Sequence, residues 1–153
     1  MNRNFFMGLL VMISFSLVST SCSNNDDDGT NTNDNLAEIQ QISNTVELGT
    51  WVITNFMDSG DNETHHFTGY SFSFNTNGTL VATNGTEIVN GSWSITEDNS
   101  SNDIDFNIFF AAPPDFNELS EDWHIQSHTN TKIDLIHISG GNGGTDLLVF
   151  EKQ

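Results

Sequence analysis

Residues 48–53, Leu-Gly-Thr-Trp-Val-Ile, are the first strand-forming run of the chain after its leader and a polar stretch. The run joins a Gly-x-Trp step, Gly49 to Trp51, to β-branched residues that favour extended backbone. No aromatic residue lies between positions 23 and 50, whereas aromatic residues are frequent from Trp51 onward. We therefore expect the hydrophobic core to begin at about Leu48 and the folded domain to span residues 48–153.

Apolar and polar residues alternate through much of this domain, which indicates β-strands with one buried face. The strongest alternation lies in residues 103–110, and Pro113-Pro114 ends that strand because proline cannot donate to a ladder. Phe116 and Leu119 then suggest one helical turn across an open end of the sheet. The remaining apolar residues predict a hairpin that places four side chains on one face: Trp123, Ile125, Ile133 and Leu135.

Two Asn-Gly steps favour two-residue hairpin turns. The turn at Asn77-Gly78 would pair Phe74 with Val81, and the turn at Asn84-Gly85 would pair Val81 with Ile88. Ile88 and Trp93 are five residues apart, so a bulge at Asn90-Gly91 is expected to bring them onto one face of a long strand spanning 86–96. The alternative is a third tight turn, which would add a ninth strand.

About eight antiparallel strands follow one another without intervening helices. Such a meander best removes its exposed edges by closing into a barrel. Before it, residues 36–47 form a short helix and linker, with apolar residues spaced three and four apart. We expect this helix to pack on the edge of the domain; the alternative is a helix that binds a partner. The predicted fold is therefore all-β, an up-and-down barrel preceded by a short helix.

Four short motifs occur in order along this domain. They are Gly49-Thr50-Trp51, Phe74-Asn75-Thr76-Asn77-Gly78-Thr79, Gly91-Ser92-Trp93 and Phe150-Glu151-Lys152. In this order and spacing the motifs resemble the lipocalin-like domains of small Bacteroidetes lipoproteins. The resemblance covers residues 48–152 and implies a lipocalin-like barrel in which Trp51 plugs the closed base.

The chain departs from the lipocalin pattern in two ways. Lipocalins place an arginine over the base tryptophan, whereas here only Lys152 could make that cation–π contact. The domain is also shorter than a full lipocalin, and an eight-stranded barrel has room only for its own side chains or one small ligand. The interior is thus either a packed core or a ligand pocket, formed by Trp51, Phe72, Phe74, Trp93, Phe106, Phe110 and Trp123.

Residues 1–21 are typical of a secretory signal peptide, with Arg3 at the start and an apolar core at 5–18. That core is shorter than the ~20 residues of a transmembrane anchor, which is the alternative. Cys22 is the only cysteine, so it cannot form an intramolecular disulfide. Residues 18–22 resemble the bacterial lipobox, which implies cleavage before Cys22 and its diacylation. An ordinary signal peptide followed by an unused thiol is the other alternative.

Residues 23–35 contain no apolar residue, so we expect 22–35 to be a lipidated, disordered tether. Within it, Asp26-Asp27-Asp28 resembles the acidic signal that sends Bacteroidetes lipoproteins to the outer face of the outer membrane. We therefore expect export and anchoring in the cell envelope through the acyl chains on Cys22, in the outer membrane and with surface display. Cleavage leaves Lys132 and Lys152 against 21 acidic residues, a balance that excludes nucleic acid as a partner.

The sequence contains no nucleophile elbow, phosphate loop or dinucleotide fingerprint, and an acylated Cys22 cannot act as a nucleophile. The histidines are His65, His66, His124, His128 and His137. In an extended segment the two adjacent histidines would point to opposite faces and could not easily share a ligand. We expect solvated histidines, with a zinc site as the alternative, and assign no catalytic residue, cofactor or metal ligand.

These observations predict a non-enzymatic, lipid-anchored envelope protein whose barrel binds a small apolar ligand. The alternative is a surface interaction or accessory lipoprotein with a filled core, which would act on a protein or glycan through its acidic exterior.

Overall fold

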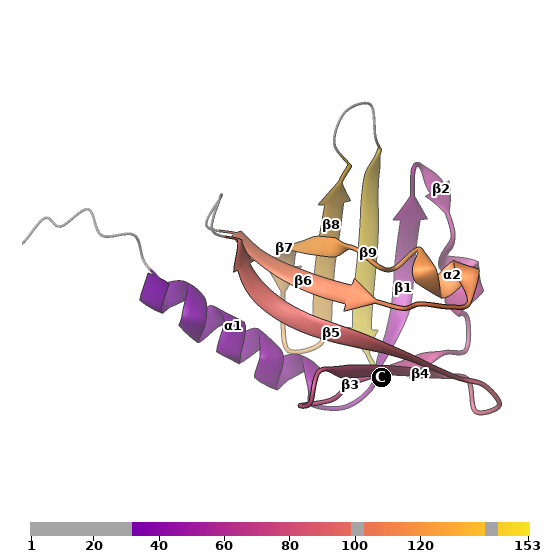
Figure 1. The fold of residues 1–153 in the computed structure, drawn as a ribbon, viewed down its shortest axis with the longest axis horizontal. Coiled ribbons are helices and arrows are strands. Elements are labelled where there is room, and N and C mark those ends of the chain that lie inside the picture. The colour runs from indigo at the N-terminus through magenta and orange to yellow at the C-terminus, as the bar shows by residue number, and fades with distance from the viewer. Residues whose placement is uncertain (1–31, 99–102, 140–143) are drawn as a thin grey trace, which may run out of the picture. The chain divides into compact units, whose positions relative to one another are not determined.

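The computed structural model describes residues 32–98, 103–139 and 144–153 (Figure 1). The predicted signal peptide, Cys22 and most of the predicted tether lie outside these residues. The described elements are α1 (Thr32–Val46), β1 (Trp51–Asp58), β2 (Asp61–Asn62), the 3₁₀ helix η1 (Thr64–Phe67), β3 (Ser71–Phe74), β4 (Thr79–Thr83), β5 (Ile88–Asp98), β6 (Asp103–Phe109), α2 (Pro114–Asn117), β7 (Asp122–His128), β8 (Lys132–Ile138) and β9 (Thr145–Lys152).

The strands form a closed antiparallel barrel in which, apart from the short β2, neighbours in the sequence are neighbours in the sheet. The order is β2-β1-β3-β4-β5-β6-β7-β8-β9, and β9 also pairs with β1, which closes the ring. Eight strands make up the barrel, because the two-residue β2 pairs with the end of β1 as a small hairpin. The predicted all-β, eight-stranded meander with a short helix before its first strand is confirmed.

The first and last strands seal the barrel over most of their length. Their register runs from Trp51 opposite Lys152 to Met57 opposite Leu147, with one irregularity between Ile53 and Asn55. This seam covers the edges that an open meander would expose to other chains.

The β3–β4 hairpin is one residue out of the predicted register. Phe74 pairs with Leu80 and not with Val81, and Leu80 is fully buried whereas Val81 is half-buried. The turn is longer than two residues: Gly78 has a left-handed backbone, with φ of 79°, but Asn77 does not, and a two-residue type I′ turn needs both. The Asn77 side chain stabilises this turn by accepting hydrogen bonds from the first residue of β4. A shift of one residue exchanges the two faces of a strand, which explains why Leu80 faces the core.

The next hairpin also has a longer turn than predicted, since Val81 pairs with Asn90 and not with Ile88. The Asn84 side chain accepts hydrogen bonds from two backbone amides of a four-residue loop. The single long strand is present as β5, but its pairing with β4 is regular and contains no bulge. No bulge is needed, because Ile88 is exposed and lies on the opposite face from the buried Trp93.

Helix α1 begins four residues before the predicted start at Leu36, within the stretch assigned to the tether. It packs on the barrel through the buried side chains of Ile42 and Val46. Leu36 is exposed, as is Leu48. The core therefore includes the second half of the helix and does not begin at Leu48. None of the helices in the described ranges has the length and apolar composition needed to cross a membrane.

Candidate functional site

The interior of the barrel is filled by aromatic rings. The seven residues predicted to form the interior or line a pocket are all buried, and none is more than 8% exposed: Trp51, Phe72, Phe74, Trp93, Phe106, Phe110 and Trp123. Phe74 contacts Trp93 and Phe106 edge-on, with ring centroids 5.4 Å apart in both pairs. Phe74 also meets Phe150 at 5.5 Å. Rings at these separations are in van der Waals contact, as in a packed core.

Trp51 closes the barrel at the end where α1 packs. Its indole Nε1 donates a hydrogen bond of 2.9 Å to the carbonyl of Val46, at the end of the helix. The Lys152 ammonium lies 4.7 Å from the indole centroid, so the cation–π contact expected from the sequence is present. Lys152 Nζ also donates to the carbonyl of Thr45 at 3.2 Å. These contacts give the Gly-x-Trp motif and the terminal lysine a structural role at the base.

The opposite end of the barrel, where α2 joins β6 to β7, is closed by two phenylalanines. Phe67 of η1 meets Phe116 of α2 edge-on at 5.3 Å. Phe67 also contacts Phe56 of β1 at 5.6 Å, and Phe116 contacts Phe110 at 5.2 Å. The predicted helical turn is therefore a plug. Phe67 was not among the predicted interior residues, because no period-two pattern surrounds it.

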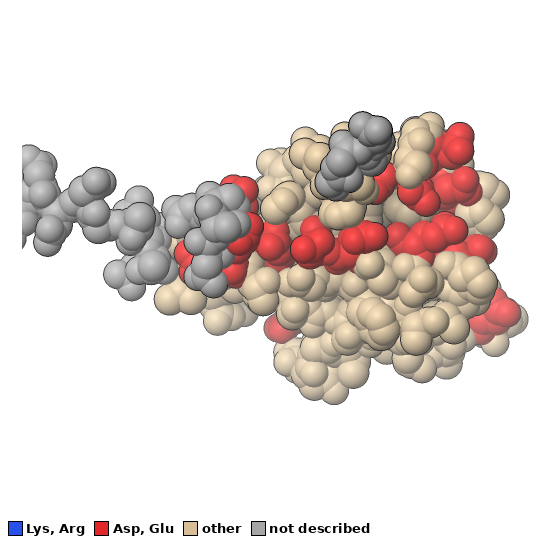
Figure 2. Space-filling model, turned by 45° about the horizontal axis from the view of Figure 1, so that its top comes forward, with Lys and Arg blue, Asp and Glu red and all other residues tan. Residues whose placement is uncertain are grey.

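A hollow of about 410 Å³ lies outside this plug, and we call it the acidic hollow. It is lined by Phe56, Asp58, Phe109, Asn117, Glu118, Ser120, Glu121 and Asp146. Four of these eight residues carry carboxylates, and Asp and Glu form a band across one face of the molecule (Figure 2). The sequence did not predict this hollow, because its lining comes from β1, the end of β6, the α2 region and β9, and these segments are spread along the chain.

Asp146 is the one charged residue among the described residues that the fold buries. One of its oxygens accepts a hydrogen bond of 2.7 Å from the backbone N–H of Ser59, whose φ of 51° is left-handed. The other oxygen lies 3.4 Å from His137 Nδ1. The Nε2 atom of the same ring faces Glu121 at 3.6 Å and Asp122 at 3.8 Å. Asp146 thus orients His137 and holds the β1–β2 turn against β9.

The carboxylates at this end of the barrel affect one another electrostatically. Partial burial raises the pKa of Glu118 above its usual value, and the charges of Asp58, Asp115 and Glu63 raise it further. His66 acts in the opposite direction. A carboxyl whose pKa is raised by surrounding anions lies in a region of negative potential, which favours cations.

Each of the five histidines lies within 4.0 Å of at least one carboxylate oxygen, and their side chains range from 18% to 70% exposed. His124 lies 2.8 Å from Asp105, and His128 lies 3.3 Å from Glu38. Burial raises the pKa of Asp105, while the charge of His124 opposes this shift. Such pairing follows from the composition, since the chain has few lysines and arginines to neutralise its acids.

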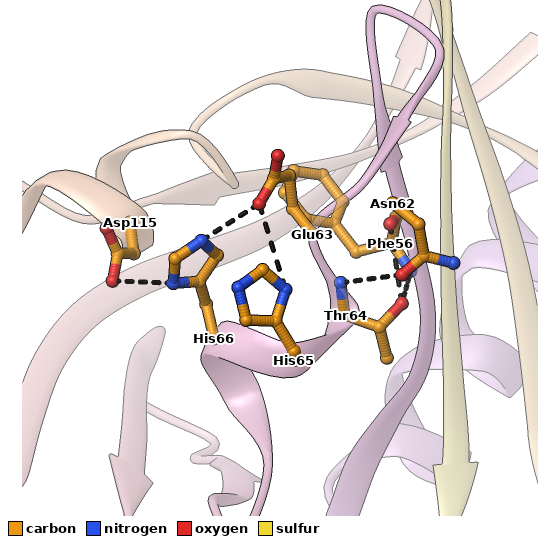
Figure 3. Close-up of polar contacts among 7 residues, drawn as sticks. All are labelled: Phe56, Asn62, Glu63, Thr64, His65, His66 and Asp115. Atoms are coloured by element: carbon orange, nitrogen blue, oxygen red, sulfur yellow. Dashed lines mark hydrogen bonds and ion pairs between the residues drawn. The ribbon is translucent and has the colours of Figure 1, made fainter.

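The two adjacent histidines do not lie in an extended segment. They lie in η1, and their rings contact each other with centroids 4.0 Å apart. The prediction that the two side chains point to opposite faces is therefore wrong. The 3₁₀ turn brings both of them towards Glu63 (Figure 3).

A second hollow, of about 240 Å³, lies between α1 and strands β6 and β7. Its lining is mixed: Ile42, Ile104 and Ile125 are apolar, whereas Glu38 and Asp103 carry charge. It therefore does not provide the apolar enclosure that a hydrophobic ligand requires.

Comparison with known proteins leaves the family of this chain open. The chain matches no protein-family model and no curated protein sequence. Among solved structures it is similar to a DUF4847 family protein from Bacteroides vulgatus ATCC 8482. That similarity has 14% sequence identity and a TM-score of 0.45, and it covers 73% of this chain and 99% of the other.

Proposed function

We propose that this chain is a lipid-anchored protein of the cell envelope whose barrel is a packed scaffold that binds a cationic partner through its acidic exterior. The observation that carries the proposal is the packing of the interior. All seven aromatic residues that could have lined a ligand pocket contact other core residues, and both ends of the barrel are plugged. A barrel filled in this way has its binding surfaces on the outside.

The anchor is proposed from the sequence alone. An apolar segment of signal-peptide length precedes Cys22, and the chain has no second cysteine with which it could form a disulfide. Acyl chains contribute about 0.8 kcal/mol per buried methylene, so two or more chains hold a protein stably on a bilayer. The protein should therefore fractionate with outer membranes, and the full chain carrying Cys22→Ala should be released. Persistent membrane association of that variant would refute the acyl anchor.

The acidic hollow is the proposed binding surface. It carries Asp58, Glu118 and Glu121 next to Asp146, and partial burial together with the neighbouring anions raises the pKa of Glu118. A basic protein segment would relieve this repulsion, and its association rate would fall with increasing salt. A probe peptide rich in lysine should bind the full chain, and the triple substitution Asp58→Asn, Glu118→Gln and Glu121→Gln should weaken binding.

A matched control separates a specific surface from net charge. Three acids elsewhere on the exterior, Glu47, Glu87 and Glu151, lie outside the hollow. Neutralising them removes the same charge and should weaken binding of the peptide much less. Equal effects of the two triple variants would show that the hollow is not the binding surface.

A carrier of small apolar ligands is the second candidate, favoured by the barrel architecture. Titration of the full chain with a neutral hydrophobic fluorophore tests it directly. We expect no saturable uptake, because the rings fill the interior. Stoichiometric uptake that a fatty acid reverses would instead establish the carrier function and refute the packed scaffold.

A further inference from the structure

Two histidines and two carboxylates converge on the outer face of η1 (Figure 3). His66 Nε2 lies 2.8 Å from Glu63 Oε2, and His65 Nδ1 lies 3.9 Å from the same oxygen. The second nitrogen of His66, Nδ1, lies 3.1 Å from a carboxylate oxygen of Asp115, which belongs to α2. The cluster thus joins the loop after the β1–β2 hairpin to the helix that plugs the barrel.

Hydrogen bonds fix the backbone that carries this cluster. The Thr64 hydroxyl accepts a hydrogen bond of 2.8 Å from the backbone N–H of Phe56 in β1. The backbone N–H of Glu63 donates to the carbonyl of Phe56 at 3.0 Å. At the other end of η1, the Phe67 ring is buried in the plug. The positions of His65 and His66 are therefore set by contacts with the barrel on both sides of the pair.

We propose that Glu63, His65 and His66 bind a divalent first-row transition-metal ion, such as zinc. Glu63 Oε2, His65 Nδ1 and His66 Nε2 would be the ligand atoms, since both nitrogens face that oxygen. Each of the three residues offers a ligand atom within 4.8 Å of those of the other two. Ligand atoms on a tetrahedral zinc ion are about 3.4 Å apart, given Zn–N and Zn–O distances of about 2.0–2.2 Å. To reach that spacing, His65 Nδ1 would approach Glu63 Oε2 from 3.9 Å, and His66 Nε2 would move away from it, from 2.8 Å. The His65 side chain is 70% exposed and so has room to rotate.

Asp115 has the geometry of an outer-shell partner. Metal-binding histidines usually donate their second N–H to a carboxylate, which fixes the ring and the tautomer. Here Asp115 faces Nδ1 of His66, so Nε2 is the nitrogen directed towards Glu63 and the proposed ion. When both ring nitrogens carry protons, each can donate to one of the two carboxylates. A metal ion would replace the proton on Nε2 and leave the proton on Nδ1 in place.

The donor set selects the class of metal. Two imidazoles and one carboxylate suit zinc, copper or nickel, whereas calcium takes six to eight oxygen ligands. The acidic side chain of Asp115 next to His66 also favours a cation at this position. The cluster around His137 is the nearest comparison, but it offers a single imidazole with Glu121 and Asp122. That difference makes His137 a matched control on the same protein.

The test is a titration of zinc into the full chain carrying Cys22→Ala. The protein is kept in detergent, and binding is measured by isothermal titration calorimetry. The cysteine is removed so that its thiol cannot bind the ion. We expect one equivalent of zinc to bind, with an affinity that falls on acidification because imidazole ligands must be neutral. His66→Ala should abolish this binding, and Asp115→Ala should weaken it about 10–100-fold. His137→Ala should leave it unchanged, and millimolar calcium should not displace the zinc.

A spectroscopic readout separates ligation from a structural role. In ¹⁵N NMR of the histidine rings, zinc should shift Nδ1 of His65 and Nε2 of His66, while Nδ1 of His66 keeps its proton. Circular dichroism of each variant checks that the barrel is folded. Absence of saturable zinc binding, or loss of it in His137→Ala but not in His66→Ala, would overturn the proposal. The site does not depend on the lipid anchor or on the acidic hollow, so its failure would leave the proposed function standing.

Discussion

Replacing Phe106 by alanine should lower the free energy of unfolding by about 3–5 kcal/mol, the range for a phenylalanine in a close-packed core. Phe106 lies on β6 and is fully buried. Its ring stacks on Trp93 at 5.8 Å and meets Phe74 edge-on at 5.4 Å. The substitution removes both contacts, each of about 0.5–1.5 kcal/mol beyond the area buried, and leaves a cavity that the rigid barrel cannot fill.

This loss is large compared with the total stability of a single domain, which is about 5–15 kcal/mol. For a domain of this size each kcal/mol corresponds to roughly 4 °C, so the melting temperature should fall by about 12–20 °C. The new cavity would be apolar and dry, and such cavities bind small aromatic molecules. The variant should therefore be stabilised by benzene, whereas the native chain should not.

The assay is unfolding in urea, monitored by tryptophan fluorescence, with and without benzene. Phe109→Ala is the matched control, because Phe109 lies on the same strand but is 55% exposed. Its free energy of unfolding should change by less than about 1 kcal/mol, as surface substitutions usually do. A loss below about 2 kcal/mol for Phe106→Ala, or stabilisation of the native chain by benzene, would refute the packed interior and point to an existing cavity.

Three further substitutions test other parts of the structure by urea unfolding. Lys152→Met should lower the free energy of unfolding by about 1–2 kcal/mol, because it removes the cation–π contact with Trp51 and a hydrogen bond to the end of α1. An unchanged free energy of unfolding would mean that the base is held by packing alone. Gly91→Ala should lower the free energy of unfolding by about 1–3 kcal/mol, because the added Cβ would clash with the backbone carbonyl oxygen of Phe109 in β6. An unchanged free energy of unfolding would contradict the close spacing of β5 and β6 at this point. Burial by itself would raise the pKa of Asp134, but hydrogen bonds from Lys132 and a serine lower it overall. Asp134→Asn should therefore cost about 0.2–1 kcal/mol at pH 7, and this cost should disappear as the pH falls through the lowered pKa; a cost that persists in acid would refute the ion pair.

The sequence predicted strands well where burial depends on the backbone period alone. Phe106 and Ile108 alternate with the polar residues Asp105 and Asn107, and both are buried. Predictions that depended on turn length were less accurate. An Asn-Gly step is compatible with a two-residue turn and with longer loops, and asparagine side chains stabilise the longer loops here. The one-residue shift that results moves Val81 out of the core and Leu80 into it.

The candidate sites were harder to predict than the fold. For the pair His65-His66 only extended backbone was considered, and nothing in the neighbouring residues indicates a 3₁₀ turn. That turn forms because Thr64 bonds to β1 and Phe67 enters the plug, and both contacts exist only in the folded barrel. Asp115, which orients His66, lies 49 residues further along the chain and was not connected with it.

The sequence by itself determined the order of the strands, the closure of the meander and the role of Lys152 over Trp51 at the base. The strand order and the closure follow from local periodicity, whereas the contact of Lys152 with Trp51 is what the resemblance to lipocalins implies for the first and last strands. Only the tertiary structure decided whether the inward-facing rings enclose a pocket or fill it. Alternation tells which side chains point inward, but the space between them depends on contacts among rings from strands that are distant in sequence. The acidic hollow and the histidine cluster depend on such distant contacts for the same reason.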